Sequence, residues 1–177
     1  MALTPDARWP SPSAPDALRS RAMLTPNDLS RYIQQHAIRA RLITDLGDVS
    51  TVPAAAAALG VRPDQILKTL LFFVRGAPYI VISHGVAPVP ARVLADHFRV
   101  GKRQIKLARP EQVAAETGYP VGGVPPLGHI HPHPVIMAQS LLDDEIVFGG
   151  GGDDRTMLEI PVSELLRLHA PALLPLR

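Results

Sequence analysis

The sequence predicts an α/β protein of the α+β type, with helices flanking a mixed, largely antiparallel and barrel-like sheet. Helix and strand patterns are interspersed along the chain, and hairpin connections between strands outnumber helical crossovers. With 46% hydrophobic and 19% charged residues, the composition is that of a globular protein. Aromatic residues account for only 5%, so we expect a core built mainly from Ala, Val, Leu and Ile.

The chain of 177 residues is expected to hold one domain preceded by a flexible arm. Residues 1–24 contain four prolines, a composition typical of a mobile segment. Residues 25–177 suit one domain and are too few for two of ordinary size. The N-terminus lacks the apolar block of a secretory signal, and no apolar run approaches the ~20 residues that cross a bilayer. We therefore expect a cytoplasmic protein without a membrane partner.

The ends of the first elements are marked by capping residues. The segment TPND at 25–28 combines an N-cap threonine, a proline at the first helical position and an acid three residues after the cap, so a helix is expected to begin there. Residues 41–44 are a candidate short strand. Ser50 or Thr51 then caps an alanine-rich helix, which Gly60 terminates.

A β-hairpin is the clearest local pattern. After a helical turn at 63–65, residues 68–74 form a short apolar and aromatic run, and residues 79–83 form a second one. Arg75-Gly76 lies between them as the expected turn. The remaining pattern predicts helices at 90–98, 110–116 and 161–168, and strands at 104–107, 134–138, 145–148 and 156–160.

Positive charge is concentrated in one segment. The 18 Lys and Arg residues against 16 Asp and Glu give a net charge of +2, which excludes a polycation that coats nucleic acid. Between positions 92 and 109, Asp96 is the single acid among Arg92, Arg99, Lys102, Arg103, Lys106 and Arg109. Such a cluster suits a local phosphate contact, and the alternative is a solvated helix and turn.

Lys68 is an unusual residue for an apolar strand. Its ammonium must reach solvent at an edge or point into a cleft, where it would need an anion. The alternative is a lysine that protects a sheet edge from aggregation. Thr69 is its neighbour, and because side chains alternate along a strand, we expect only one of the two to line a given surface in the absence of a bulge.

A loop rich in glycine and proline is the second candidate site. Residues 118–129 have the sequence GYPVGGVPPLGH, in which the glycines permit close backbone approach and the prolines fix the path. Backbone N–H groups exposed by such a loop can hold a phosphate or the oxyanion of an acyl-transfer intermediate. The spacing excludes a Walker loop and a Gly-x-Ser-x-Gly elbow. A structural surface loop is the alternative.

Three histidines follow this loop, at 129, 131 and 133. In extended backbone all three imidazoles would lie on one side, where they could hold a catalytic zinc. No HExxH motif or identifiable fourth ligand accompanies them, so the alternative is exposed or hydrogen-bonded histidines. The absence of cysteine excludes disulfides, thiolate metal sites and a cysteine nucleophile. We expect neither a metal nor a cofactor.

Several segments in the same order resemble the YbaK/prolyl-tRNA synthetase-associated domain family, whose members hydrolyse mischarged aminoacyl-tRNA. The similarity extends from about Thr25 to Leu168, and its carriers are residues 49–52, 65–70, 117–128, 145–152 and 158–166. The resemblance implies a barrel-like core flanked by helices. It also implies a cleft lined by the strand lysine, the glycine and proline loop and a late glycine turn.

The resemblance further implies roles for single residues. Lys68 matches the family lysine that holds the 3′ end of the substrate, and Gly122 and Gly123 match the loop whose backbone orients the ester carbonyl. These three are the candidate catalytic residues. At 149–152 this chain has four glycines where some members carry Ser or His. Candidate substrate-binding residues are Thr69, Tyr119, Gly128, His129 and Gly151.

The partner implied is the 3′ acceptor end of an aminoacyl-tRNA, with contacts from Arg99, Lys102, Arg103 and Lys106. An aminoacyl ester is an activated bond, so a water oriented by backbone amides and by a ribose hydroxyl can suffice without a strong nucleophile. The leading hypothesis is deacylation of tRNA that carries a small, wrongly attached amino acid. The alternatives are a non-catalytic module that binds an aminoacyl end or small ligand, and a metal-dependent hydrolase built on the three histidines.

Overall fold

A computed structural model describes residues 23–176 of the chain. The predicted arm at 1–24 therefore lies almost entirely outside the described residues. Leu24, at its end, donates its N–H to the carbonyl of Gly118 at 2.8 Å. Within the described residues, no helix is long and apolar enough to cross a membrane.

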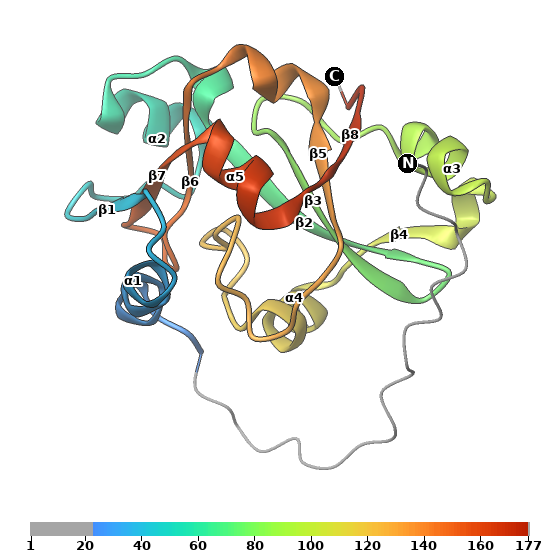
Figure 1. Cartoon of the computed structure of the whole chain (residues 1–177), viewed down its shortest axis with the longest axis horizontal. Helices are drawn as coiled ribbons and strands as arrows, with labels where there is room; N and C mark the ends of the chain where they lie inside the picture. The colour runs from blue at the N-terminus through green and yellow to red at the C-terminus, as the bar shows by residue number, and fades with distance from the viewer. Residues whose placement is uncertain (1–22, 177) are drawn as a thin grey trace.

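The larger of two sheets has five strands in the order β4-β2-β3-β5-β8. β2 and β3 are antiparallel, as are β2 and β4, whereas β5 runs parallel to both of its neighbours. The strands are β2 (Leu67–Val74), β3 (Ala77–His84), β4 (Ile105–Leu107), β5 (Val135–Ala138) and β8 (Ala172–Leu174). The β2–β3 hairpin forms the long central ribbon of Figure 1.

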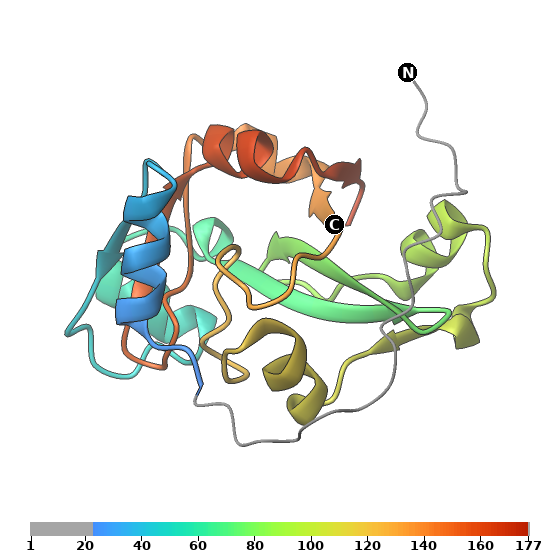
Figure 2. The ribbon, with the colours of Figure 1, turned by 60° about the horizontal axis from the view of Figure 1, so that its bottom comes forward.

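The smaller sheet has three antiparallel strands in the order β1-β7-β6. They are β1 (Arg41–Ile43), β6 (Ile146–Gly150) and β7 (Met157–Pro161). A parallel bridge between Ile66 and Phe148 joins the start of β2 to β6. Figure 2 shows this small sheet at one end of the β2–β3 ribbon, with α4 on one side of the ribbon and α5 on the other.

Five α-helices cover the sheets, and three short 3-10 turns connect elements within the described residues. The helices are α1 (Pro26–Gln35), α2 (Val52–Leu59), α3 (Ala91–Phe98), α4 (Pro110–Thr117) and α5 (Val162–His169). The 3-10 turns are η1 (Pro63–Gln65), η2 (Lys102–Gln104) and η3 (Gln139–Asp143).

The predicted helix signals act as expected. Thr25 and Asp28 form a reciprocal capping box at the start of α1, and Thr51 caps α2 by accepting from the N–H of Ala54. Gly60 ends α2 in the left-handed conformation, with φ of 68°. These contacts satisfy backbone groups that a helix end would otherwise leave unpaired.

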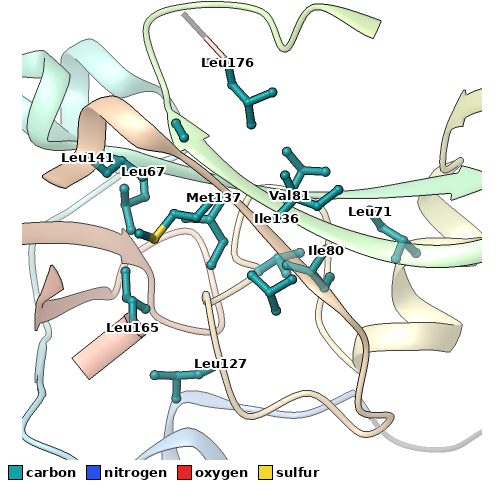
Figure 3. Close-up of a cluster of buried hydrophobic side chains, with 14 of the residues drawn as sticks. Leu67, Leu71, Ile80, Val81, Leu127, Ile136, Met137, Leu141, Leu165 and Leu176 are labelled. Atoms are coloured by element: carbon teal, nitrogen blue, oxygen red, sulfur yellow. The ribbon is translucent and has the colours of Figure 1, made fainter. Parts of the chain in front are cut away.

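Two hydrophobic clusters form the interior. The main one combines side chains of β2, β3, β5 and α5 with Leu127 from the glycine and proline loop, and Figure 3 shows Leu127 and Leu165 on the same side of Met137. The smaller cluster lies between α2 and the small sheet and consists of Val49, Ala55, Ala56, Ile66, Phe148 and Met157. The small sheet contributes to both clusters, because its residues Val147, Leu158 and Ile160 belong to the main one.

The fold class predicted from the sequence is confirmed, with two refinements. The strands form two sheets and not one closed barrel within the described residues. β8 was not predicted, because Ala172–Leu174 is short and lies between Pro171 and Pro175, which act as turn signals. β8 nevertheless forms because β5 offers it a parallel partner.

Candidate functional site

A cavity of about 320 Å³ lies where the two hydrophobic clusters meet. We call it the central cavity, and its lining residues are Val49–Val52, Ile66–Leu71, Leu107, Ala108, Val113, Val121, Gly122, Val124, Gly150 and Met157. Most of these side chains are aliphatic. Lys68 is the single charged residue among the described residues that line the cavity, so an anionic ligand group would be held at its position.

The cavity follows an unpaired part of the β2 edge. β3 pairs with the whole of β2 on one edge, while β4 pairs on the other edge only with residues 72–74. Between those residues and the bridge at Ile66, no described strand covers residues 67–71. Ala108 donates its N–H to the carbonyl of Leu71 at 2.9 Å, and by alternation the backbone N–H and C=O of Thr69 face the same edge.

Lys68 and Thr69 both contribute to the cavity wall. The expectation that only one of them could line a given surface was wrong, because the cavity opens on the strand edge and not on one face of the sheet. Lys68 is exposed and has no ion-pair partner among the described residues. The Thr69 hydroxyl is buried and has no described hydrogen-bond partner.

The glycine and proline loop places Gly122 and Gly123 differently. Gly122 lines the cavity with φ of 95°, and no described residue accepts from its N–H. Gly123 is not among the lining residues, and its N–H donates to the carbonyl of Pro120 at 3.1 Å. The amide of Gly123 thus closes a turn. Val121 and Val124, also in the wall, have N–H groups without a described acceptor.

The late glycine turn packs directly on this loop. Gly152 donates its N–H to the carbonyl of Gly123 at 2.9 Å, and a Cβ at Gly123 would lie 2.8 Å from the backbone nitrogen of Asp153. Gly150 lines the cavity. Gly151 does not line it, and its N–H donates to the carbonyl of Thr156 at 2.9 Å within the β6–β7 turn. The glycines are needed for close backbone approach between the two segments.

Three other predicted substrate-binding residues lie behind the loop and not in the cavity wall. Tyr119 is fully buried, and burial raises the pKa of its hydroxyl. Gly128 packs against the side chains of Leu29 and Tyr32. His129 bonds the carbonyl of Pro125 through Nε2 at 2.8 Å, and burial lowers its pKa to about 4. The neutral imidazole therefore supports the loop from inside.

The three histidines do not assemble a metal site. His133 places Nε2 3.2 Å from the carbonyl oxygen of Glu116, whereas the His129 ring is held at Pro125. Among the described residues no group of three His, Cys, Asp or Glu side chains could hold a metal ion. The His129 and His133 rings instead contact separate backbone carbonyls.

A second cavity, of about 730 Å³, lies beyond Leu107. We call it the basic pocket, and its lining residues are Phe73, Arg75, Gly76, Arg103, Gln104, Lys106, Leu107, Arg109 and Gln112. Of the four cations predicted to contact tRNA, Arg103 and Lys106 line it, whereas Arg99 and Lys102 do not. Arg75 was not predicted as a binding residue. The sequence signal for it is that an arginine occupies the first position of the expected hairpin turn, where Asn or Asp is favoured.

The chain is similar to known proteins over most of its length. Residues 47–168 match the aminoacyl-tRNA editing domain family. The proline–tRNA ligase of Nitratidesulfovibrio vulgaris (strain DP4) is 31% identical over 124 residues, which are 69% of this chain and 21% of that enzyme. The uncharacterized protein YwhH of Bacillus subtilis (strain 168) is 30% identical over 117 residues, 66% of this chain and 73% of YwhH. The chain thus spans about a fifth of the ligase.

Solved structures share the fold. The hypothetical protein APE2540 superposes with a TM-score of 0.73 at 30% identity, covering 82% of this chain and 96% of that one. A protein described as a candidate trans-editing enzyme for prolyl tRNA synthetase gives a TM-score of 0.77 at 25% identity, covering 84% and 93%. The family match extends from the segment before α2 to the end of α5 and includes every segment that forms the central cavity, so this chain belongs to the aminoacyl-tRNA editing domain family.

Proposed function

We propose that this protein is a trans-editing hydrolase that removes a small, wrongly attached amino acid from aminoacyl-tRNA. The observation that carries the proposal is the shared cavity of Lys68 and Gly122, which come from a central strand and a distant loop. A cation beside exposed backbone donors suits a substrate that combines a phosphate or ribose with an ester carbonyl.

The reaction is the addition of water to the ester carbonyl. The bond between the acyl carbon and the ribose oxygen then breaks, and the products are a free amino acid and a tRNA with its hydroxyl restored. A neighbouring ribose hydroxyl helps to orient the water. Lys68 holds phosphate or ribose oxygens as a cation, and the chain supplies no covalent nucleophile in this scheme.

The oxyanion donors are assigned to the loop amides that remain available. Gly123 was expected to be one of them, but its N–H already bonds Pro120. The loop N–H groups in the cavity wall that have no described acceptor belong to Val121, Gly122 and Val124, and we assign the main contact to Gly122. A single donor of this kind lowers an acyl-transfer barrier by about 3 kcal/mol.

Selection of the amino acid is assigned to the aliphatic wall. Val49, Val52 and Met157 line the cavity on the side of α2 and the small sheet. A wall of this kind excludes side chains that are too large more strongly than it rejects smaller ones, since one methylene changes binding by only about 1–3 kcal/mol. The amino acid removed is therefore expected to be among the smallest that are wrongly attached.

A panel of mischarged tRNAs tests the proposal. We expect one charged tRNA to lose its amino acid faster than in buffer, and Lys68→Ala to lower kcat/KM on it by about 100-fold. Arg92→Gln is the matched control, because Arg92 is an exposed cation outside both cavities. Full activity of Lys68→Ala would refute the mechanism. Binding of charged tRNA without any turnover would establish the non-catalytic alternative instead.

A further inference from the structure

The basic pocket gathers cations from three separate segments. Arg75 comes from the β2–β3 turn, Arg103 and Lys106 from η2 and β4, and Arg109 from the start of α4. No Asp or Glu is among the described residues that line the pocket. All four side chains belong to exposed residues, and none forms an ion pair within the described part of the chain.

The lack of a carboxylate partner distinguishes these four cations from most of the other described arginines. Among the described residues, six arginines elsewhere pair with a carboxylate: Arg31, Arg39, Arg41, Arg62, Arg92 and Arg167. Four unpaired like charges around one hollow repel each other unless an anion enters. The arrangement is therefore suited to a ligand with more than one negative charge.

The backbone at Arg75 is a second, independent observation. Its φ is +51° and that of Gly76 is +86°, which are the values of a type I′ turn. Asn, Asp or Gly normally occupies the first of these positions, because other side chains are strained there. An arginine thus occupies a turn position that favours other residues, and this arginine lines the basic pocket. Backbone strain of this kind is common at functional sites.

The rest of the lining suits nucleotides better than a small anion. Phe73 and the largely exposed Leu107 offer apolar surface between the cations, on which bases can stack. Gln104 and Gln112 use their side-chain oxygens to accept from Gly101 and Arg109, so their amide NH₂ groups remain available as donors. Charges for phosphates together with apolar surface for bases are the features of a single-stranded nucleic-acid groove.

The two cavities adjoin at the end of β4. Leu107 lines both of them, and the next residue, Ala108, lines the central cavity and holds the β2 edge through Leu71. In Figure 2, β4 leads from the hairpin end of the β2–β3 ribbon back toward α4, below that ribbon. The basic pocket is therefore the neighbouring hollow for a chain that leaves the central cavity past Leu107.

We propose that the basic pocket binds the phosphodiester backbone of the single-stranded nucleotides that precede the esterified 3′ nucleotide. This inference rests on the proposed function, since it places the aminoacyl group in the central cavity. Arg75, Arg103, Lys106 and Arg109 contact phosphates, and Phe73 and Leu107 support the bases. The pocket then supplies affinity for the nucleic acid and leaves the ester bond to the central cavity.

The test compares two substrates that share one ester. One is the mischarged tRNA hydrolysed in the panel, and the other is the same amino acid esterified to adenosine alone. We expect the double variant Arg75→Gln/Arg103→Gln to lower kcat/KM at least 10-fold on the tRNA and less than 2-fold on the adenosine ester. The dependence of log kcat/KM on log salt should also become shallower by about two. Arg92→Gln should leave kcat/KM unchanged on both substrates.

The outcomes separate the two proposals. An equal loss on both substrates, or no loss on the tRNA, overturns the basic pocket as a phosphate site. If the wild-type protein hydrolyses neither substrate, the proposed function fails, and the pocket is then judged by the affinity for uncharged tRNA. In that case the double variant must weaken binding at least 10-fold with the shallower salt dependence, and an unchanged affinity overturns the pocket.

Discussion

The central cavity and the basic pocket lie side by side at β4, but one is lined mainly by aliphatic side chains and the other by cationic ones. The first is smaller, aliphatic and served by one cation, Lys68, whereas the second is more than twice as large and served by four. The first also depends on close packing between two glycine segments, whereas the second consists of exposed side chains on a turn, a short strand and a helix start. Close packing determines the central cavity, and charge determines the basic pocket. Substitutions that disturb packing and substitutions that remove a charge should therefore have different effects on stability, turnover and binding.

The largest expected effect comes from Gly123→Ala, which acts on the packed region. The new Cβ would lie 2.8 Å from the backbone of Asp153, and backbone cannot yield as a flexible side chain does. We expect unfolding to become easier by about 2 kcal/mol and deacylation to fall about 100-fold, with little change in affinity for uncharged tRNA. Chemical denaturation, turnover and binding are the measurements.

Gly101→Ala is the control for that variant, because a Cβ at Gly101 meets nothing within 4 Å and its φ is negative. It should retain stability and turnover. Equal damage from both substitutions would show that the contact between the loop and the β6–β7 turn is not what shapes the cavity.

A second prediction contrasts paired with unpaired arginines. The buried carboxylate of Glu164 accepts from Arg167 at 2.6 Å and from Arg39 at 3.0 Å, and these contacts lower its pKa to about 2. Glu164→Gln should therefore cost about 2 kcal/mol at neutral pH, measured by denaturation. Since the folded pKa lies below the unfolded value, the stabilisation is present above about pH 4.5 and disappears as the pH falls toward 2.

Charge removal in the basic pocket provides the contrast. Arg109→Gln should change the free energy of unfolding by less than about 0.5 kcal/mol, because no described carboxylate pairs with Arg109. A loss as large as that of Glu164→Gln would show that the pocket cations serve the fold and not a ligand.

A third prediction concerns the pH response of the loop that shapes the cavity. Burial lowers the pKa of His129 to about 4, so the folded protein resists protonation that the unfolded chain accepts below about pH 6.5. Stability should fall by about 1 kcal/mol between pH 7 and pH 5.5 and continue to fall toward pH 4. His129→Gln, which keeps a donor for Pro125, should remove this contribution to the pH dependence of stability. Thermal unfolding measured across this pH range checks it, and an unchanged pH dependence in the variant would contradict the prediction.

The smallest expected effect has opposite signs in stability and binding. Arg75→Asn places a favoured residue at the first position of the type I′ turn and should stabilise the fold by about 0.5 kcal/mol. The same change removes one cation from the basic pocket and should weaken tRNA binding. A melting temperature that rises while affinity drops would support a functional reason for the strained arginine. A parallel loss of both would contradict it.

Much of the fold could be predicted from local signals. The cap at Thr25, the glycine stop at Gly60 and the Arg75-Gly76 turn are each determined by neighbouring residues, and the structure has all three as expected. Strand partners are determined by distant residues. The parallel pairing of β5 with β3 and β8, and the separation into two sheets, left no local pattern to recognise.

The candidate site could likewise be predicted only where local sequence signals mark its residues. Lys68 and Gly122 could be singled out because each departs from its surroundings in chemical type or backbone freedom. Gly123 could not be separated from Gly122 by sequence, since the difference is a hydrogen bond to Pro120. Arg75 joins Arg103 only because the β2–β3 turn lies against β4, a contact between segments almost 30 positions apart.

The part of the β2 edge around Thr69, between the bridge at Ile66 and the contact of Leu71 with Ala108, has a consequence for solubility. A bare strand edge can recruit another polypeptide into a shared sheet, and proteins normally block it with a charge or a cover. Here Lys68 supplies the charge and the loop that carries Val121 and Gly122 supplies the cover, because both border the cavity at this edge. Variants that detach the loop should therefore self-associate on mild heating, which light scattering would detect. The residues proposed to receive the substrate would then also keep the molecule monodisperse.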